Sequence, residues 1–131
     1  SRRAIESQRG ASAVEFVLVV PLLMALVFAI ITYGVVAAQQ ISLNHAVREG
    51  ARAAVVVSGL GDDTVSTKVN AAYTWGAASE DPVAVTTSGA CGSGLGDDLT
   101  VTATKDTWTP AFPVPGVPAE LQAQAVFRCE F

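Results

Sequence analysis

The feature that most constrains this chain is an uncharged stretch from Phe16 to Ala38, made up mainly of Val, Leu, Ile, Phe and Ala. At a rise of about 1.5 Å per residue, a helix over this stretch covers the roughly 30 Å thickness of the hydrocarbon core of a bilayer. No other stretch of the 131 residues approaches this length. We therefore predict one membrane-spanning helix, with room for one small domain and not for two large ones.

The distribution of arginines around this stretch predicts its orientation. Arg2, Arg3 and Arg9 lie within a few residues before it, whereas Arg48 and Arg52 follow about ten residues beyond its end. An excess of Lys and Arg on one short flank places that flank on the cytoplasmic side. We expect a single-pass protein of the cytoplasmic membrane, with its N-terminus inside and its C-terminal domain outside.

A cleavable secretory signal peptide is the alternative interpretation of the same stretch, with the small residues 36–38 as its cleavage site. Two observations count against it. The apolar stretch is longer than the roughly 7–15 residues usual for such signals. In addition, Pro21 lies near the start of the stretch and not near its end.

The helical pattern continues beyond the predicted span. Arg48, Glu49 and Arg52 alternate with apolar residues spaced three and four apart, which are Ile41, Ala46, Val47, Ala51, Ala54 and Val55. Gly50 alone costs a helix only about 1 kcal/mol. We predict one continuous helix over about residues 13–57, roughly 65 Å long. Its stalk needs a packing partner, because an isolated amphipathic helix leaves its apolar stripe in water.

The rest of the chain predicts a small α+β domain with one short helix and a three-stranded antiparallel sheet. Residues 58–61 break the stalk, and Asp62 or Asp63 caps a helix that runs through Trp75. Its inner face carries Val65, Val69, Ala72 and Tyr73. A high content of Val and Thr predicts strands at Val83–Thr87 and Leu99–Thr104. Alternation of apolar and polar residues supports the second of these and predicts a closing strand at Leu121–Phe131. The glycine-rich turn 89–98 and the proline-rich, exposed segment 110–118 connect them.

Charge and cysteine content narrow the function of this domain. Residues 53–131 hold nine acids and three basic residues, and so acidic a surface repels phosphate backbones; nucleic-acid binding is excluded. Cys91 and Cys129 are too few for a zinc site, which takes about four ligands. A disulfide between them is favoured if the domain lies in an oxidising compartment, and two free buried thiols are the alternative.

Little in the sequence indicates an enzyme, a cofactor or a metal. His45 is the single histidine and falls on the predicted stalk. The serines lack a base in a recognisable motif. Asp62-Asp63 and Asp97-Asp98 each follow a Gly-Leu-Gly triplet, but calcium loops of the EF-hand type need alternating oxygen ligands and a terminal Glu, so turns are favoured. We assign the aromatic residues to core or interface: Trp75, Trp108, Phe112 and Phe127.

The junction Gly10–Phe16, with sequence GASAVEF, is the most informative motif. A carboxylate at the bilayer centre costs several kcal/mol. Glu15 avoids most of this cost if it stays at the headgroup level, where it also faces the positive end of the helix dipole. This explains why Glu15 is tolerated but not why small residues and a glycine precede it.

The segment resembles the type IV prepilin-like cleavage signal, in the version found in Flp pilins and TadE-like minor pilins of tight-adherence systems. Two further segments resemble TadE-like proteins: 47–54, with sequence VREGARAA, and the last strand, 121–130. Major Flp pilins are much shorter and almost entirely helical, so the additional domain favours the minor, TadE-like class. Residues 60–118 resemble the family poorly.

The resemblance implies that a prepilin peptidase cuts between Gly10 and Ala11 and leaves Glu15 as the fifth mature residue. The chain then divides into a leader (1–10), a membrane and stalk helix (11–58) and an extracytoplasmic domain (59–131). It implies a structural subunit with other pilins and the membrane as partners, in a pilus for adhesion, secretion or DNA uptake. The alternative is an unprocessed single-pass protein whose outer domain binds an envelope partner.

The spacing adds its own chemistry to this processing site. A cut before Ala11 frees an amine four residues from Glu15, which is about one helical turn. In a low dielectric, a carboxylate beside an ammonium is far more stable than either group alone. Glu15 can pair with the Ala11 amine of its own subunit or with that of a neighbouring subunit. We expect the pairing between subunits to set the register of assembled helices, with Phe16 as the adjacent register residue.

Overall fold

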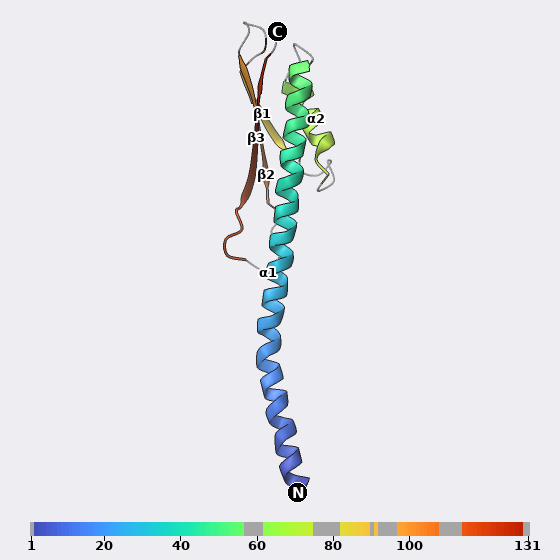
Figure 1. Ribbon diagram of the computed structural model, residues 1–131, viewed down its shortest axis with the longest axis vertical. Coiled ribbons are helices and arrows are strands. Elements are labelled where there is room, and N and C mark those ends of the chain that lie inside the picture. Colours follow the sequence, from blue (N-terminus) through green and yellow to red (C-terminus); the bar gives the residue numbers. More distant parts are fainter. Residues whose placement is uncertain are drawn as a thin grey trace. The chain divides into compact units, whose positions relative to one another are not determined.

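The computed structural model describes the backbone of residues 2–56, 62–74, 82–89, 91, 97–107 and 114–129, and the side chains from Gly10 onward except that of Asp62. It contains two helices, α1 (Arg2–Val56) and α2 (Asp62–Ala72). Three strands follow, β1 (Ala84–Ser88), β2 (Asp98–Asp106) and β3 (Glu120–Arg128). The predicted α+β class, with one long helix, one short helix and an antiparallel sheet, is confirmed (Figure 1).

The long helix α1 starts earlier than predicted, at Arg2 instead of about residue 13. The residues before Gly10 continue the helix because they include no proline and no run of β-branched residues, both of which oppose helix formation. The chain forms two compact units, Ser1–Gly34 and Val35–Phe131, which are described separately. The predicted divisions after Gly10 and after residue 58 concern processing and translocation, and they stay predictions.

In the second unit, the stalk part of α1 finds its packing partner within the chain. Its small and aliphatic side chains belong to one core with α2 and the sheet, and they are Leu43, Ala46, Val47, Ala51 and Ala54. Val65 and Val69 of α2 are buried in that core, as predicted. The prediction that Ile41 belongs to the apolar stripe is wrong: it is 58% exposed, because it lies on the opposite side of the helix from Leu43 and Val47.

The sheet has the order β1-β2-β3, and both pairs are antiparallel (Figure 1). The predicted alternation holds, because one face buries apolar side chains in the core, namely Leu99, Val101, Ala103, Leu121, Ala123 and Ala125. The outer face is mainly neutral and polar, with rows such as Thr86-Thr102-Gln124 across the three strands. The strands differ from prediction by one to three residues at their ends, where pairing extends to Asp98 and Asp106 and stops at Arg128.

Three side chains of the second unit form hydrogen bonds that connect its helices and strands. Asn70 of α2 accepts from the Val83 N–H at 2.8 Å and donates to the Val83 carbonyl at 3.4 Å, so it imitates a strand partner. Ser42 Oγ of α1 accepts from the Thr74 N–H at 3.1 Å just beyond α2. Gln40 donates its amide to the Gln122 carbonyl of β3 at 2.9 Å. These contacts fix α2 and the sheet to residues 40–42 of α1.

Candidate functional site

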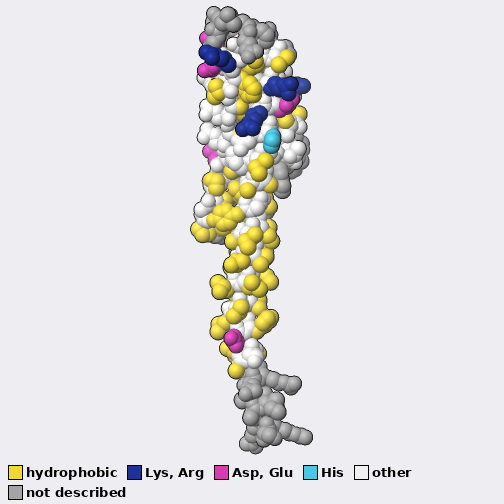
Figure 2. Space-filling model, viewed as in Figure 1, with side chains coloured by type: hydrophobic (Ala, Val, Ile, Leu, Met, Phe, Trp, Pro, Cys, Tyr) yellow, Lys and Arg dark blue, Asp and Glu magenta, His cyan; other side chains and the backbone are white. Residues whose placement is uncertain are grey.

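The candidate functional site begins with the apolar stretch of α1, whose large apolar side chains from Phe16 to Ile31 are mostly exposed. Phe16, Leu18 and Leu22 are 69%, 73% and 72% exposed. Among the described residues, α1 is the one helix long and apolar enough to cross a membrane, and that stretch is not buried within the chain. Figure 2 shows hydrophobic side chains along this part of the surface. A helix that is apolar all round and finds no protein cover is suited to a lipid environment.

The apolar stretch contains few polar side chains, and the hydroxyl of Thr32 forms its hydrogen bond within the same helix. Thr32 donates its hydroxyl to the Phe28 carbonyl at 2.8 Å, one turn back along the helix. The helix continues through Pro21, which lacks an N–H to donate. An unsatisfied polar group in hydrocarbon costs several kcal/mol, so a hydroxyl that bonds within its own helix removes that cost. The stretch therefore needs no partner to satisfy Thr32.

The predicted processing and register residues lie on successive turns at the start of this stretch. Gly10, Ala11, Glu15 and Phe16 are all helical and exposed. Glu15 is the single charged side chain between Gly10 and Ala38. A methyl group added to Gly10 meets no atom within 4 Å, so packing against the described residues gives no reason for glycine at this position.

In the segment 47–54, small and apolar residues lie on one side of α1 and charged residues on another. Val47, Gly50, Ala51 and Ala54 face the core, whereas the charged residues between them are exposed. Gly50 lies against α2, with Val65 Cγ1 at 3.6 Å from the position of an added methyl group and Val69 Cγ2 nearer still. Small residues here allow the two helices to approach closely. This close approach is a structural reason for glycine at position 50.

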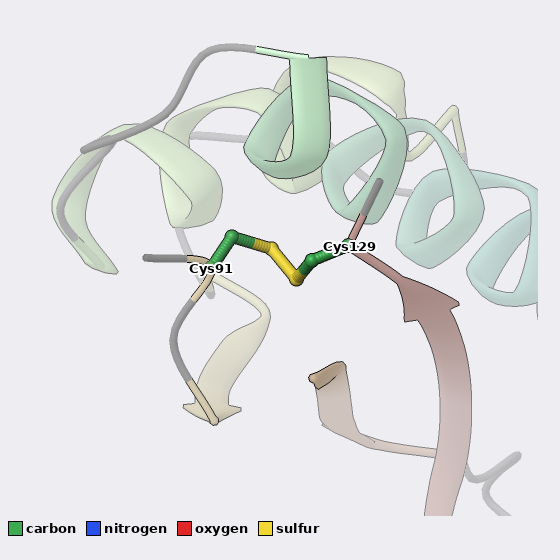
Figure 3. The surroundings of a disulfide bond; sticks show 2 residues. All are labelled: Cys91 and Cys129. Carbon is green, nitrogen blue, oxygen red and sulfur yellow. A yellow bond between two sulfur atoms is a disulfide. The ribbon is translucent and has the colours of Figure 1, made fainter. Parts of the chain in front are cut away.

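The two cysteines form a disulfide at one end of the sheet (Figure 3). Cys91 lies in the connection after β1, Cys129 follows the last residue of β3, and their Cα atoms are 5.5 Å apart. The Cys129 N–H also donates to the Asp97 carbonyl at 2.8 Å, which extends the β2–β3 ladder by one residue. The bond therefore ties the end of β3 to the β1–β2 connection, and disulfides of this kind persist in oxidising compartments.

The remaining candidates from the sequence do not converge on one place. His45 is exposed on α1, and within the described residues no three His, Cys, Asp or Glu side chains are placed to hold a metal ion. Phe127 is half-buried against the core. The aromatic residues Trp75, Trp108 and Phe112, and both Gly-Leu-Gly triplets, lie outside the described residues.

The sequence patterns did not identify Gln40, Ser42 or Asn70 as residues whose hydrogen bonds connect separate elements. Their hydrogen-bond partners lie 82, 32 and 13 residues away in the chain. Periodicity registers only neighbours within a few residues, so it gave no signal for such contacts. For Asn70 a weak signal existed, because Asn in the body of a short helix is unfavourable unless its side chain is used.

Fold and site together define a protein in which a long apolar helix precedes a small, disulfide-bonded α+β domain. Residues 10–52 match the family described as TadE-like protein. The resemblance inferred from the sequence is thereby confirmed over this segment. The matched residues include the Gly10–Phe16 junction and the Gly50 contact. No curated protein and no solved structure matches the chain.

Proposed function

We propose that this chain is a minor pilin or pseudopilin of a tight-adherence-type pilus, processed by a prepilin peptidase and assembled through its N-terminal helix. The observation that carries the proposal is the family match over residues 10–52, on a helix that includes an unburied apolar stretch long enough to cross a membrane. A structural role follows from this surface, because a helix without cover in its own chain needs lipid or other helices around it.

The proposed topology places the N-terminus in the cytoplasm and the small domain outside. The three arginines before the span support it through the charge asymmetry of the flanks. The disulfide between Cys91 and Cys129 supports it independently, since such bonds form on the oxidising side of a membrane. The charge pattern and the redox chemistry thus favour the same orientation.

Processing requires a local change in α1. The peptide bond between Gly10 and Ala11 lies within the helix, where the backbone is hydrogen-bonded and closed to an active site. Unwinding is least costly near a helix end and at glycine, which is about 1 kcal/mol less favourable in a helix than alanine. Gly10 therefore serves two purposes in this proposal: it opens the helix for cleavage and presents no side chain to the peptidase.

Assembly in this proposal relies on the carboxylate of Glu15 after the cut. The new amine of Ala11 lies one turn away, within the same apolar surroundings. When a neighbouring helix supplies the amine, its pairing with Glu15 removes two isolated charges from a low dielectric and fixes the axial position of the two helices. Phe16 follows directly and packs beside that pair.

Two variants of the full chain in its native membrane test these steps. Gly10→Val should block removal of the leader, because a β-branched side chain both fills the recognition position and stiffens the helix. Glu15→Gln should be processed and inserted normally but enter pili poorly, since the neutral amide cannot compensate the amine. Normal assembly of the Glu15→Gln protein would contradict the register role. Retention of the leader in wild-type protein would favour the unprocessed single-pass alternative.

A further inference from the structure

The second unit exposes one face of α1 that its own domain leaves uncovered. The side chains on this face recur at three- and four-residue spacing, and they are Ile41, His45, Arg48, Glu49, Arg52 and Val56. We call this set the outer helix face. Ile41 and Val56 are 58% and 66% exposed at its two ends. Arg48, Glu49 and Arg52 are all exposed, and together they give the face an excess of one positive charge.

A complementary feature lies on the outer face of the sheet. Asp106 and Glu120 are cross-strand partners at one end of the β2–β3 ladder, and both are exposed. Like charges directly opposite each other on a sheet are destabilising. At the other end of the same ladder the partners are Asp98 and Arg128, which carry opposite charges. The acidic corner, Asp106 with Glu120, thus places two like charges opposite each other, whereas the other end of the ladder places opposite charges together.

The two features point in opposite directions from one core. Leu43 and Val47 of α1 share that core with Val101 and Ala123 from the inner face of the sheet. The outer helix face and the outer sheet face therefore lie on opposite sides of the unit. A surface that is positive on one side and negative on the other suits contacts in which the front of one copy meets the back of the next.

We propose that the outer helix face of one copy of this chain docks on the acidic corner of a second copy. The inference rests on the proposed function and deepens it by naming a partner surface outside the membrane. Arg48 and Arg52 of one copy lie beside Asp106 and Glu120 of the other, while Ile41 and Val56 cover neutral residues of the sheet. The contact is heterologous, so it repeats into a row of subunits instead of closing as a dimer.

The positions of these residues along the unit set the displacement between copies. The bond from Gln40 to the Gln122 carbonyl places these two residues at the same level, and β3 runs alongside α1 in the same direction (Figure 1). Arg48 and Arg52 lie about 12–18 Å beyond Gln40 along the helix. Glu120 lies about 7 Å before Gln122 along the strand. Parallel copies therefore meet with an axial displacement of about 20 Å.

A second copy fits the outer helix face better than an anionic bilayer surface does. Arg48 lies ten residues beyond the last residue of the apolar stretch, Ala38, which is about 15 Å along the helix. At physiological salt the field of a charged surface decays over about 8 Å. The exposed carboxylates of the acidic corner, by contrast, are present in every copy of the chain.

Photocrosslinking of the full-length protein in its native membrane tests this contact. A benzophenone amino acid in place of His45 should yield an adduct of two copies joined near Glu120. Charge reversal on either side, by R48E with R52E or by D106K with E120K, should lower that yield by about tenfold, because attraction becomes repulsion. Combining all four reversals should restore the yield. Exchange of the compensated pair, D98K with R128E, is the matched control and should leave it unchanged.

The outcomes separate this inference from the proposed function. An adduct yield that ignores the reversals, a fourfold variant that fails to regain it, or an adduct with another protein would overturn the contact. The N-terminal residue is determined in the same samples. Cleavage before Ala11 with a charge-insensitive adduct would leave the pilin proposal standing alone. An uncleaved chain with a charge-dependent adduct would leave the contact standing without the pilin proposal.

Discussion

Gly50 of α1 lies so close to Val69 of α2 that a methyl group on Gly50 would overlap the Val69 Cγ2 atom. Both residues are fully or almost fully buried, and valine has little rotamer freedom with which to move aside. We predict that Gly50→Ala destabilises the folded domain by about 1–3 kcal/mol, in spite of the better helix propensity of alanine. Thermal unfolding of the full-length protein in detergent, followed by tryptophan fluorescence, measures the effect.

A compensating substitution checks the cause. Val69→Ala removes the overlapped atom, so the double variant Gly50→Ala/Val69→Ala should lose less stability than the sum of the two single variants. Additive losses would mean that the helices do not meet at this point.

Loss of the disulfide should weaken the domain strongly. Cys91 and Cys129 are 38 residues apart, and by the loop-closure model a crosslink of this span contributes on the order of 4 kcal/mol. We predict a loss of this size for the double variant Cys91→Ser/Cys129→Ser, measured by denaturant unfolding. Wild-type protein treated with a reductant should match the variant, and equal stability of oxidised and reduced wild type would contradict the prediction.

Asn70 should be needed to hold the start of β1 against α2. Asn70→Ala leaves the Val83 N–H and carbonyl without their side-chain partner and should cost about 1–3 kcal/mol. Hydrogen exchange at the Val83 amide gives the local readout: the amide should be protected in wild type and exchange faster in Asn70→Ala. Asn70→Asp retains an acceptor for that N–H, so it should preserve more of the protection than Asn70→Ala does.

Stability should fall at alkaline pH through Tyr73. Burial raises the pKa of the Tyr73 phenol above its ordinary value of 10.0. The folded state therefore keeps a proton that the unfolded state releases, so the contribution is complete below the unfolded pKa and is lost as pH rises through the folded one. We predict stability that is insensitive to this group below about pH 9 and declines above about pH 10.

Tyr73→Phe isolates this effect. All other groups are the same in both proteins, so the comparison is between the two slopes of stability against pH. The variant should show the shallower decline, and identical slopes would exclude Tyr73 as the cause.

Local sequence patterns were sufficient to predict the elements and most of the core. The alternation of Leu99, Val101 and Ala103 with threonines reports one buried and one exposed face of a strand, and both faces are as expected. The error at Ile41 has a physical origin. Spacing alone does not say which of two neighbouring faces of a helix is covered, and that choice is made by α2 and the sheet through Gly50 and Gln40.

The junction at the start of the apolar stretch could be predicted from the sequence, whereas the proposed contact between copies could not. The junction from Gly10 to Phe16 was recognisable because cleavage and membrane entry depend on adjacent residues. The relation between the outer helix face and the acidic corner was not, because it depends on the strand register that places Asp106 opposite Glu120. A register is decided by the packing of a whole sheet face, and no short segment contains it.

The N-terminal residue of the protein extracted from native membranes and from purified pili tests the central claim most directly. Mass spectrometry of the N-terminal peptide is the measurement. We predict that the chain begins at Ala11 in both fractions, with Glu15 as its fifth residue. A chain that still carries the residues before Ala11, or that is absent from pili in which other subunits are present, would contradict the account.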